Sequence, residues 1–81
     1  MKVKVLFFAS ARELTGETEI TLDLEDGATS TQLPEILMSL YPDLDIQRDR
    51  MSLAINQVYC REQTELHERD VVAVLPPISG G

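Results

Sequence analysis

The sequence is poor in the residues that metal sites and nucleophilic catalysis most often use. It contains one histidine, one cysteine and no tryptophan among 81 residues. One histidine and one cysteine are too few for a zinc site, and a lone cysteine excludes both a four-thiolate iron–sulfur cluster and an intrachain disulfide. The glycine motifs of phosphate-binding loops, dinucleotide sites and serine hydrolases are also missing. We therefore expect no metal site, no permanently bound cofactor and a reducing compartment, the cytosol.

Positive charge and long apolar runs are scarce as well. Lysine and arginine number 7 against 14 acidic residues, which gives a net charge of −7. Such a chain repels phosphate backbones, so we expect no nucleic-acid binding, and its acidity suits a basic partner surface. The longest apolar run near the N-terminus, residues 5–9, is far too short for a membrane span or a signal segment, so we expect a soluble protein.

The length of the chain predicts a single domain. A chain of this size buries about 60 % of its surface on folding, which suffices for one core but leaves little material to enclose a deep catalytic cleft. We therefore expect a carrier, a binding module or a subunit that is not catalytic alone.

The N-terminal third predicts two strands joined by a short helical turn. Residues 2–9 begin with alternating side chains, which is typical of a strand. Residues 10–16 suit a helical turn, with Ser10 as the N-cap and Gly16 as a left-handed stop. Residues 18–24 alternate cleanly and predict a second strand, antiparallel to the first. On the first strand, one face carries Val3, Val5 and Phe7, and the other carries Lys4, Leu6 and Phe8.

The main helix follows the turn at Asp26 and Gly27. Pro34 is tolerated only in a first turn, which places the N-cap at about Thr31, and Pro42 ends the helix. The stripe of apolar residues that predicts this helix is Leu33, Ile36, Leu37, Leu40 and Tyr41.

The C-terminal half predicts a hairpin and a final strand. Residues 43–50 are mostly polar and are interpreted as a loop. Residues 52–55 and 58–60 flank Asn56, which can take the positive φ of a hairpin turn. Residues 71–75 are nearly all apolar, as expected of a central strand buried on both faces. The element order predicts an α+β protein with the β-grasp architecture, in which one main helix packs across one face of a small mixed sheet. This domain covers residues 1–77, and residues 78–81 form a flexible tail.

The end of the chain has the clearest chemical pattern. Pro76 and Pro77 fix φ and favour an extended strut, and Ile78 can bind in a groove of a partner. Gly80 and Gly81 lack Cβ atoms, so this end can enter a narrow channel. A terminal carboxylate is a poor electrophile until an ATP-dependent enzyme converts it to an acyl-adenylate. A plain flexible tail is the alternative interpretation.

Three blocks of sequence carry a family resemblance. They are Val-Leu-Phe-Phe-Ala at 5–9 with Arg-Glu-Leu-Thr-Gly at 12–16, Ala-Ile-Asn-Gln at 54–57, and Pro-Pro-Ile-Ser-Gly-Gly at 76–81. Through them the chain resembles the small subunits of molybdopterin synthases, which are ubiquitin-like β-grasp sulfur carriers, over essentially its whole length.

The resemblance implies a role for each end residue. Gly81 would be adenylated by an E1-like activating enzyme that uses ATP, and would then become a thiocarboxylate. Gly80 would be its threading neighbour in the channel of the large subunit, with which a heterotetramer is expected. The sulfur would be donated there to cyclic pyranopterin monophosphate. One departure is Arg69, where the family usually has glycine; a positive φ there would cost about 1 kcal/mol.

A docking surface is expected on the open face of the sheet. Leu6 and Phe8 lie there by alternation, and Leu75 and Tyr59 are expected to join them. An apolar patch with an acidic rim is the form that we expect. Together with Pro76, Pro77 and Ile78, these residues are the candidate partner-binding residues. The alternative for Phe8 is a core position beneath a loop.

Three other side chains are interpreted as structural. Cys60 could act as a sulfur relay, but a lone strand cysteine is more often an inert small hydrophobe. Arg12 and Glu13 are expected to form an ion pair, and His67 to be solvated.

Three functional alternatives remain open from the sequence. One is a sulfur carrier for the thiazole of thiamine, although such chains are typically shorter and lack the Arg-Glu-Leu block and the proline pair. The others are a ubiquitin-like protein modifier and a passive interaction domain.

Overall fold

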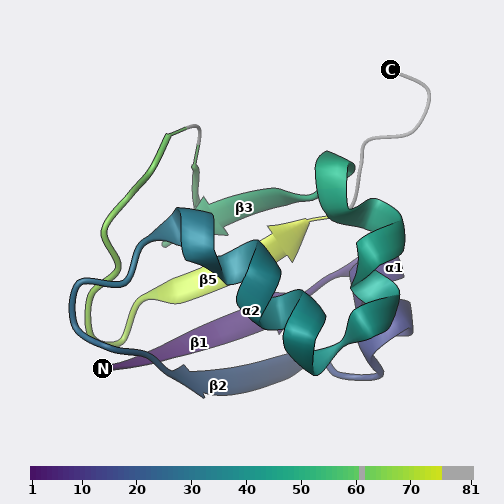
Figure 1. The fold of residues 1–81 in the computed structure, drawn as a ribbon, viewed down its shortest axis with the longest axis horizontal. Coiled ribbons are helices and arrows are strands. Elements are labelled where there is room, and N and C mark those ends of the chain that lie inside the picture. Colours follow the sequence, from purple (N-terminus) through teal and green to yellow (C-terminus); the bar gives the residue numbers. More distant parts are fainter. Residues whose placement is uncertain (61, 76–81) are drawn as a thin grey trace.

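A computed structural model of the chain describes residues 1–60 and 62–75 (Figure 1). Its strands are β1 (Lys2–Phe7), β2 (Glu19–Asp23), β3 (Ser52–Ile55), β4 (Val58–Tyr59) and β5 (Val71–Leu75). Its α-helices are α1 (Ala9–Thr15) and α2 (Leu33–Leu40), and its 3-10 helices are η1 (Ser30–Gln32) and η2 (Pro42–Arg50). In the described part of the chain, no helix is long and apolar enough to span a membrane.

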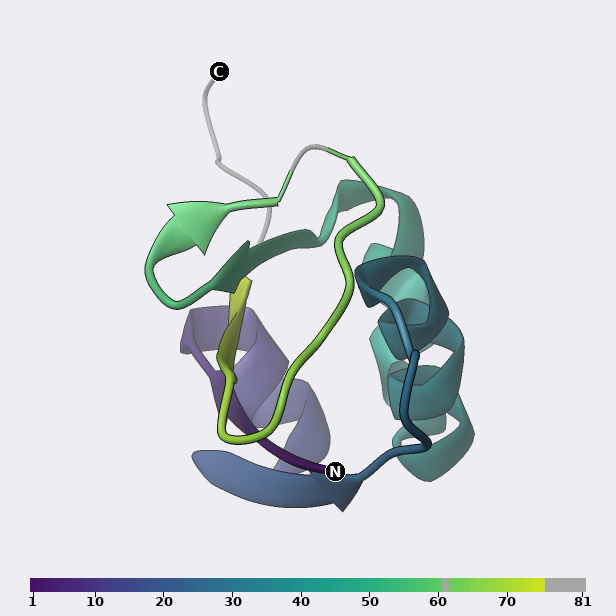
Figure 2. The same ribbon diagram turned by 90° about the vertical axis from the view of Figure 1, so that its left-hand side faces the viewer.

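The strands form one mixed sheet in the order β2-β1-β5-β3-β4. The central pair β1 and β5 is parallel, and the other three pairs are antiparallel. Figure 2 shows α2 and η2 as a layer on one side of this sheet. The α+β class, the β-grasp architecture and the central place of residues 71–75 are thereby confirmed.

The core lies between the sheet and this helical layer. Alternate residues of β1 and β5 point into it, as the period of a strand requires. The ring of Phe7 meets Tyr41 edge-on, with ring centroids 5.7 Å apart. The fully buried large side chains are Phe7, Leu33, Leu37, Leu44, Leu66, Val3, Val5, Val72 and Val74.

Two helix starts differ from the predicted ones. The N-cap of α1 is Phe8 and not Ser10, because the Phe8 carbonyl already accepts the Ala11 N–H at 3.0 Å. The strand therefore ends two residues earlier than expected. The N-cap of α2 is Gln32, one residue after the expected Thr31. The 3-10 helix η1 precedes it and is capped by Thr29, whose N–H donates to the side chain of Gln32 at 2.8 Å.

The segment interpreted as a loop is a 3-10 helix, η2, whose core contact is Leu44. The Leu44 N–H donates to the Tyr41 carbonyl at 3.0 Å, so the chain continues to coil after Pro42. A helix with so few apolar residues has no amphipathic stripe for a sequence reading to detect.

The hairpin turn and Gly16 agree with the sequence. Asn56 and Gln57 both have positive φ, at 50° and 72°, the pattern of a tight two-residue hairpin turn. Gly16 ends α1 with a left-handed φ of 74°. Arg69 also has a positive φ, at 70°, in the turn where its departure from glycine had suggested strain.

Candidate functional site

The open face of the sheet is defined by the strand register. Leu6 lies beside Ala73, Ala73 lies opposite Ala54, and Ala54 lies opposite Tyr59, so one row of side chains crosses four strands. Leu75 follows Ala73 at the strand period and lies opposite Ser52. This face is turned away from α2, because the intervening residues of β1 and β5 fill the core.

The predicted docking residues do share this face. Phe8 has extended backbone angles, so its side chain continues the alternation after the buried Phe7. Its side chain is 38 % exposed and that of Tyr59 is 62 % exposed, whereas Leu75 is half-buried. The alternative of a core position for Phe8 is therefore wrong. We name Leu6, Phe8, Tyr59, Ala73 and Leu75 the apolar patch.

One part of the prediction for β5 is wrong. Val72 and Val74 are buried, but Ala73 and Leu75 are only half-buried on the open side. The helices cover one face of the sheet, so a strand can be central in the sheet and still present half its side chains outward. An unbroken apolar run does not distinguish these two situations.

The rim of this face is mixed in charge, whereas only acidic residues were expected. Glu19 and Asp23 lie on this face opposite Leu6 and Lys2, and basic residues lie beside them. Lys2, Lys4 and Arg69 line a hollow of about 290 Å³ together with Val71, at the far end of the strands from Leu75. Lys4 Nζ lies 3.6 Å from Glu19 Oε2. The sequence held the signal for this rim, since Lys2 and Lys4 share the strand period of Leu6.

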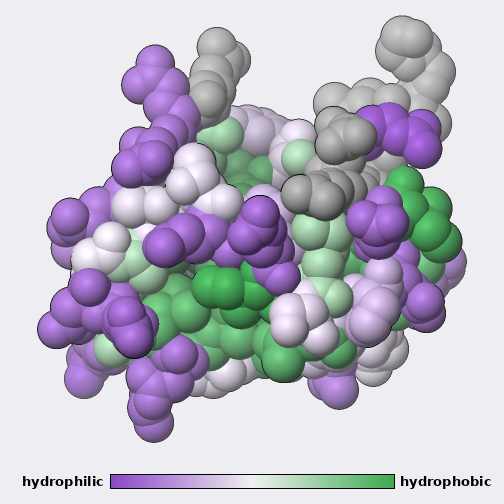
Figure 3. Space-filling view, in the orientation of Figure 1, coloured by the Kyte–Doolittle hydropathy of each residue, from purple (hydrophilic) through white to green (hydrophobic). Residues whose placement is uncertain are grey.

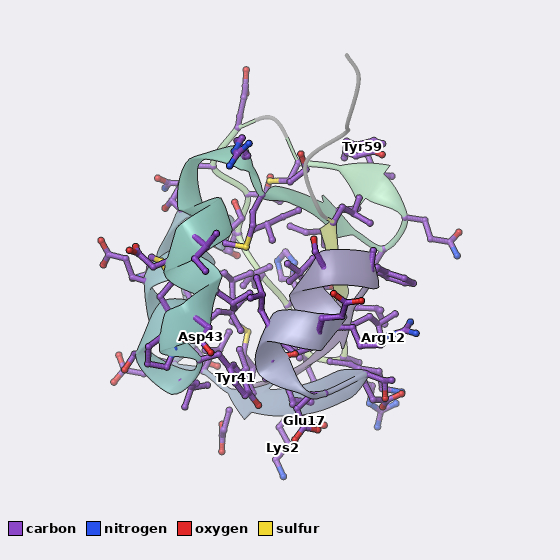
Figure 4. The ribbon with its side chains drawn as sticks, turned by 90° about the vertical axis from the view of Figure 1, so that its right-hand side faces the viewer. Lys2, Arg12, Glu17, Tyr41, Asp43 and Tyr59 are labelled. Atoms are coloured by element: carbon purple, nitrogen blue, oxygen red, sulfur yellow. The ribbon has the colours of Figure 1, made fainter. Side chains whose placement is uncertain are left out.

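Arg12 lies beside the other end of the face. Its Nε donates to the carbonyl oxygen of Phe7 at 3.3 Å, in place of the expected pairing with Glu13. In Figure 4, Arg12 and Tyr59 lie on the side of the molecule away from η2, which carries Asp43. Arg12 therefore stabilises the exit of the chain from β1 into α1.

Five of the predicted site residues lie outside the described residues. They are Pro76, Pro77, Ile78, Gly80 and Gly81. The described chain ends at Leu75, on the same face as the apolar patch. The residue from which the C-terminal segment continues is thus part of the exposed apolar surface. The assignment of residues 78–81 as a separate tail stays a prediction.

Cys60 has a structural environment. Its Sγ lies 3.2 Å from Ser30 Oγ and 3.0 Å from the carbonyl oxygen of Glu62, to which a thiol can donate. Ser30 is the buried polar residue of the core, and its Oγ accepts the Thr64 N–H at 3.0 Å. These contacts fasten Cys60, Glu62 and Thr64 to η1, which leads into α2. Sequence reasoning missed Ser30, because one serine before a helix has no distinguishing pattern.

The described residues contain no candidate metal centre. Within residues 1–60 and 62–75, no group of three or more histidine, cysteine, aspartate or glutamate side chains is placed to hold a metal ion. His67 is exposed and its Nε2 lies 3.1 Å from Glu65 Oε1.

The comparisons with known proteins cover the whole chain. The model of the ThiS family matches residues 5–81. The chain is 40 % identical, over 81 residues, to the molybdopterin synthase sulfur carrier subunit of Arabidopsis thaliana, covering 100 % of this chain and 84 % of the relative. Further curated relatives bear the same name.

Several solved structures have the same fold as this chain. A protein described as putative molybdopterin converting factor, subunit 1, from Pyrococcus furiosus superposes with a TM-score of 0.86 at 32 % identity, covering 95 % of this chain and 98 % of that one. A chain in the complex of subunits 1 and 2 of the molybdopterin-converting factor from Helicobacter pylori matches with a TM-score of 0.74 at 27 % identity, with full coverage of both chains. SAMP1 from Haloferax volcanii, at 22 % identity and a TM-score of 0.85, shares the fold.

Proposed function

The chain belongs to the ThiS family, and from this membership we propose that it is the sulfur-carrying small subunit of a molybdopterin synthase. The observation that carries the proposal is that the family match runs through residue 81 and so includes the glycine pair. Relatives named molybdopterin synthase sulfur carrier subunit support this assignment over the related carrier for thiazole synthesis.

The proposed chemistry takes place at the carboxylate of Gly81 in two steps. A carboxylate oxygen attacks the α-phosphorus of ATP, pyrophosphate leaves, and an acyl-adenylate forms. Hydrosulfide then attacks the acyl carbon and AMP leaves, which gives the thiocarboxylate directly. If the sulfur is supplied as a persulfide, an acyl disulfide forms first, and a thiol of the activating enzyme releases the thiocarboxylate by forming a disulfide with the donor sulfur. The first step is needed because an oxide is too poor a leaving group from an ionised carboxylate, whereas AMP leaves readily from a mixed anhydride. ATP belongs to the activating enzyme and is not a bound cofactor of this chain.

The product of these steps is a thiocarboxylate, whose sulfur is nucleophilic. We propose that the segment after Leu75 inserts into the large subunit and that this sulfur attacks cyclic pyranopterin monophosphate there. Gly80 would allow the close approach of the channel walls, since it has no Cβ. The small subunit contributes the donor atom, and the large subunit contributes the catalytic pocket.

The proposed partner surface is the apolar patch with its rim of mixed charge. An exposed apolar surface of this kind is a common site of protein association. A complex between subunits 1 and 2 is known for the Helicobacter pylori molybdopterin-converting factor. By analogy we propose that the large subunit covers Phe8, Tyr59 and Leu75 in a heterotetramer, and that an E1-like enzyme binds the chain before it. Both encounters are proposed to occur in the cytosol, where Cys60 stays reduced.

The test is intact-mass analysis after incubation with the activating enzyme, ATP and a sulfur source. We expect a mass increase that corresponds to one sulfur in place of one oxygen, located in the C-terminal peptide. The increase should be absent without ATP and present in Cys60→Ser. Sulfur found on Cys60, or no change with an activating enzyme that is competent on a known carrier, would contradict the proposal.

The alternative of a ubiquitin-like modifier requires a different outcome. It shares the adenylation step, so the mass experiment alone does not separate the two. Conjugates of this chain on lysines of other proteins, seen as a high-mass ladder in cell extract, would favour the modifier. Their absence together with a stable thiocarboxylate supports the carrier.

A further inference from the structure

The strand β2 forms an outer edge of the sheet beside an apolar groove. In the described part of the chain, β1 is the only strand that pairs with β2. The groove lies between β2 and α2 and has a volume of about 460 Å³. Figure 3 shows hydrophobic surface in this region with hydrophilic side chains around it. The residues that line the groove are Leu22, Asp23, Leu24, Glu35, Ile36, Ser39 and Leu40.

The hydrogen bonds of β2 leave alternate backbone groups directed at this edge. Met1 and Leu24 bond to each other twice, at 2.7 and 2.8 Å, and the Phe7 N–H donates to the Thr18 carbonyl at 2.9 Å. In an antiparallel pair, such residues alternate with residues whose N–H and C=O point away from the partner strand. Glu19, Thr21 and Asp23 are therefore the residues that present donors and acceptors to the outer edge.

The two sides of this edge differ in chemistry. Leu22 and Leu24 face α2 across the groove, whereas Glu19, Thr21 and Asp23 face the opposite side by alternation. A strand added here would place every second side chain over the groove. Its other side chains would lie beside the carboxylates of Glu19 and Asp23. The edge thus suits a segment in which aliphatic and basic residues alternate.

The inner edge of β2 already pairs with such a segment, namely β1. Val3 and Val5 of β1 are buried. The basic residues that alternate with them lie on the open side. Lys2 is opposite Asp23, whose Oδ1 is 3.7 Å from the Met1 ammonium nitrogen, and Lys4 Nζ is 3.6 Å from Glu19 Oε2. On its inner edge, β2 thus pairs with a strand in which basic and aliphatic residues alternate. A strand on its outer edge would meet the same carboxylates, those of Glu19 and Asp23.

We propose that the outer edge of β2 and its groove bind an extended segment of a partner protein, in which lysine or arginine alternates with aliphatic residues, as an additional strand of the sheet. A second copy of this chain is disfavoured, because pairing two β2 edges would bring the carboxylates of both copies together. This surface is separate from the apolar patch, and the inference goes beyond the proposed sulfur transfer.

The probe is a short synthetic peptide of alternating lysine and valine, titrated into the isotope-labelled full chain and followed by NMR. We expect the largest shifts at the amides of Glu19, Thr21 and Asp23 and at the methyl groups of Leu40, with none of comparable size at Tyr59. A peptide of alternating glutamate and valine should not bind. Shifts confined to the apolar patch, or equal binding of both peptides, would overturn the proposal.

Two variants and a matched control distinguish peptide binding at the groove from a general attraction of the basic peptide to the negatively charged chain. Asp23→Lys should weaken peptide binding about fivefold, since an exposed charge pair is lost and reversed. Asp45→Lys makes the same charge change on η2, outside the groove, and should weaken it less than about twofold at physiological salt, where screening acts within about 8 Å. Leu40→Ser removes an apolar side chain that is 53 % exposed, so it should fold normally and still bind more weakly. Equal losses of peptide affinity in Asp23→Lys and Asp45→Lys would contradict the proposal.

The contribution of the backbone is tested with a chemically altered peptide. Methylation of the amide nitrogens along one edge removes the donors that strand addition uses and leaves the side chains in place. We expect the methylated peptide to lose binding. Unchanged affinity would show that side chains alone hold the peptide and that no strand is added.

Discussion

At the scale of single residues, the backbone is strained where residues other than glycine have positive φ angles. Asn56 has a φ of 50°, and asparagine is among the residues that tolerate the left-handed region. Ala9 and Arg69 have φ angles of 47° and 70°, and their side chains lack the short polar group that lowers the energy of the left-handed region for asparagine. The surrounding structure holds them there: Arg69 N–H donates to the Lys2 carbonyl at 2.8 Å, and Ala9 follows directly on the cap residue of α1.

Replacing Arg69 with glycine should relieve one of these strains. Glycine adopts positive φ without a steric cost, and the substitution keeps the N–H that bonds to Lys2. We expect the free energy of unfolding in urea to rise by about 0.5–1 kcal/mol. Arg12→Gly is the control. Because Arg12 lies inside α1, glycine there should lower the free energy of unfolding by about 1 kcal/mol. A loss of stability in both variants would mean that the Arg69 side chain contributes more than its backbone costs.

At the scale of the elements, η2 shows how one residue can determine a segment. Leu44 is fully buried within a stretch that is otherwise polar, and it packs into the core beside the main helix. Ile46, two residues later, is 70 % exposed. Leu44 therefore fixes η2 to the core and Ile46 does not, while Tyr41 and Met51 on either side of η2 also pack against the core.

This difference gives a paired prediction. Leu44→Ala should lower the free energy of unfolding by about 2–5 kcal/mol, because it leaves a cavity in the core. Ile46→Ala should change it by less than about 0.5 kcal/mol, as is usual at the surface. Chemical denaturation of both variants measures the contrast. Similar losses would indicate that η2 packs through both side chains.

The strand β4 provides a matched pair for the docking surface. Tyr59 and Val58 are neighbours, 62 % and 68 % exposed, but they point to opposite faces because Val58 lies opposite Ile55. Tyr59→Asp should weaken binding to the large subunit by about 2 kcal/mol or more, the scale of a buried contact at the centre of an interface. Val58→Asp, with the same charge change, should bind nearly as well as the original chain. Isothermal titration separates them, and equal effects would refute the choice of face.

The sequence predicted the elements whose period is strong and missed those whose geometry depends on the tertiary structure. Alternation in β1 separated Val3 and Val5 from Leu6 and Phe8, and the structure places the first two in the core and the other two on the open face. The start of α1 could not be found, since a phenylalanine cap without a side-chain hydrogen bond has no signature. The grouping of Lys2, Lys4 and Arg69 on the rim of the open face was also missed, because it depends on a contact between Arg69 and Lys2, which are far apart in sequence.

At the scale of the whole molecule, fold and proposed chemistry are separable. The described core residues all precede the proposed sulfur site in sequence. We therefore expect a change at Gly81 to leave the buried contacts described above unaltered. Stability and transfer should respond to different substitutions.

Changing the length of the chain end tests this separation. Deleting Gly81, or adding one residue after it, should leave Tm nearly unchanged, because exposed chain ends contribute little to the core. Formation of molybdopterin by the reconstituted synthase should be lost in both cases. Calorimetry and product assays measure the two effects. An extended chain that stays active without being trimmed would rule out insertion to a fixed depth.

The position of β5 also has a mechanical consequence. This strand leads directly into the C-terminal segment and is paired on both sides, in parallel with β1 and antiparallel with β3. A pull along the chain end, such as withdrawal from a tight channel, loads both ladders in shear, so that many backbone bonds share the force. An edge strand would share it with one neighbour only. We therefore expect the sheet to stay closed if the proposed insertion and withdrawal pull on the chain end.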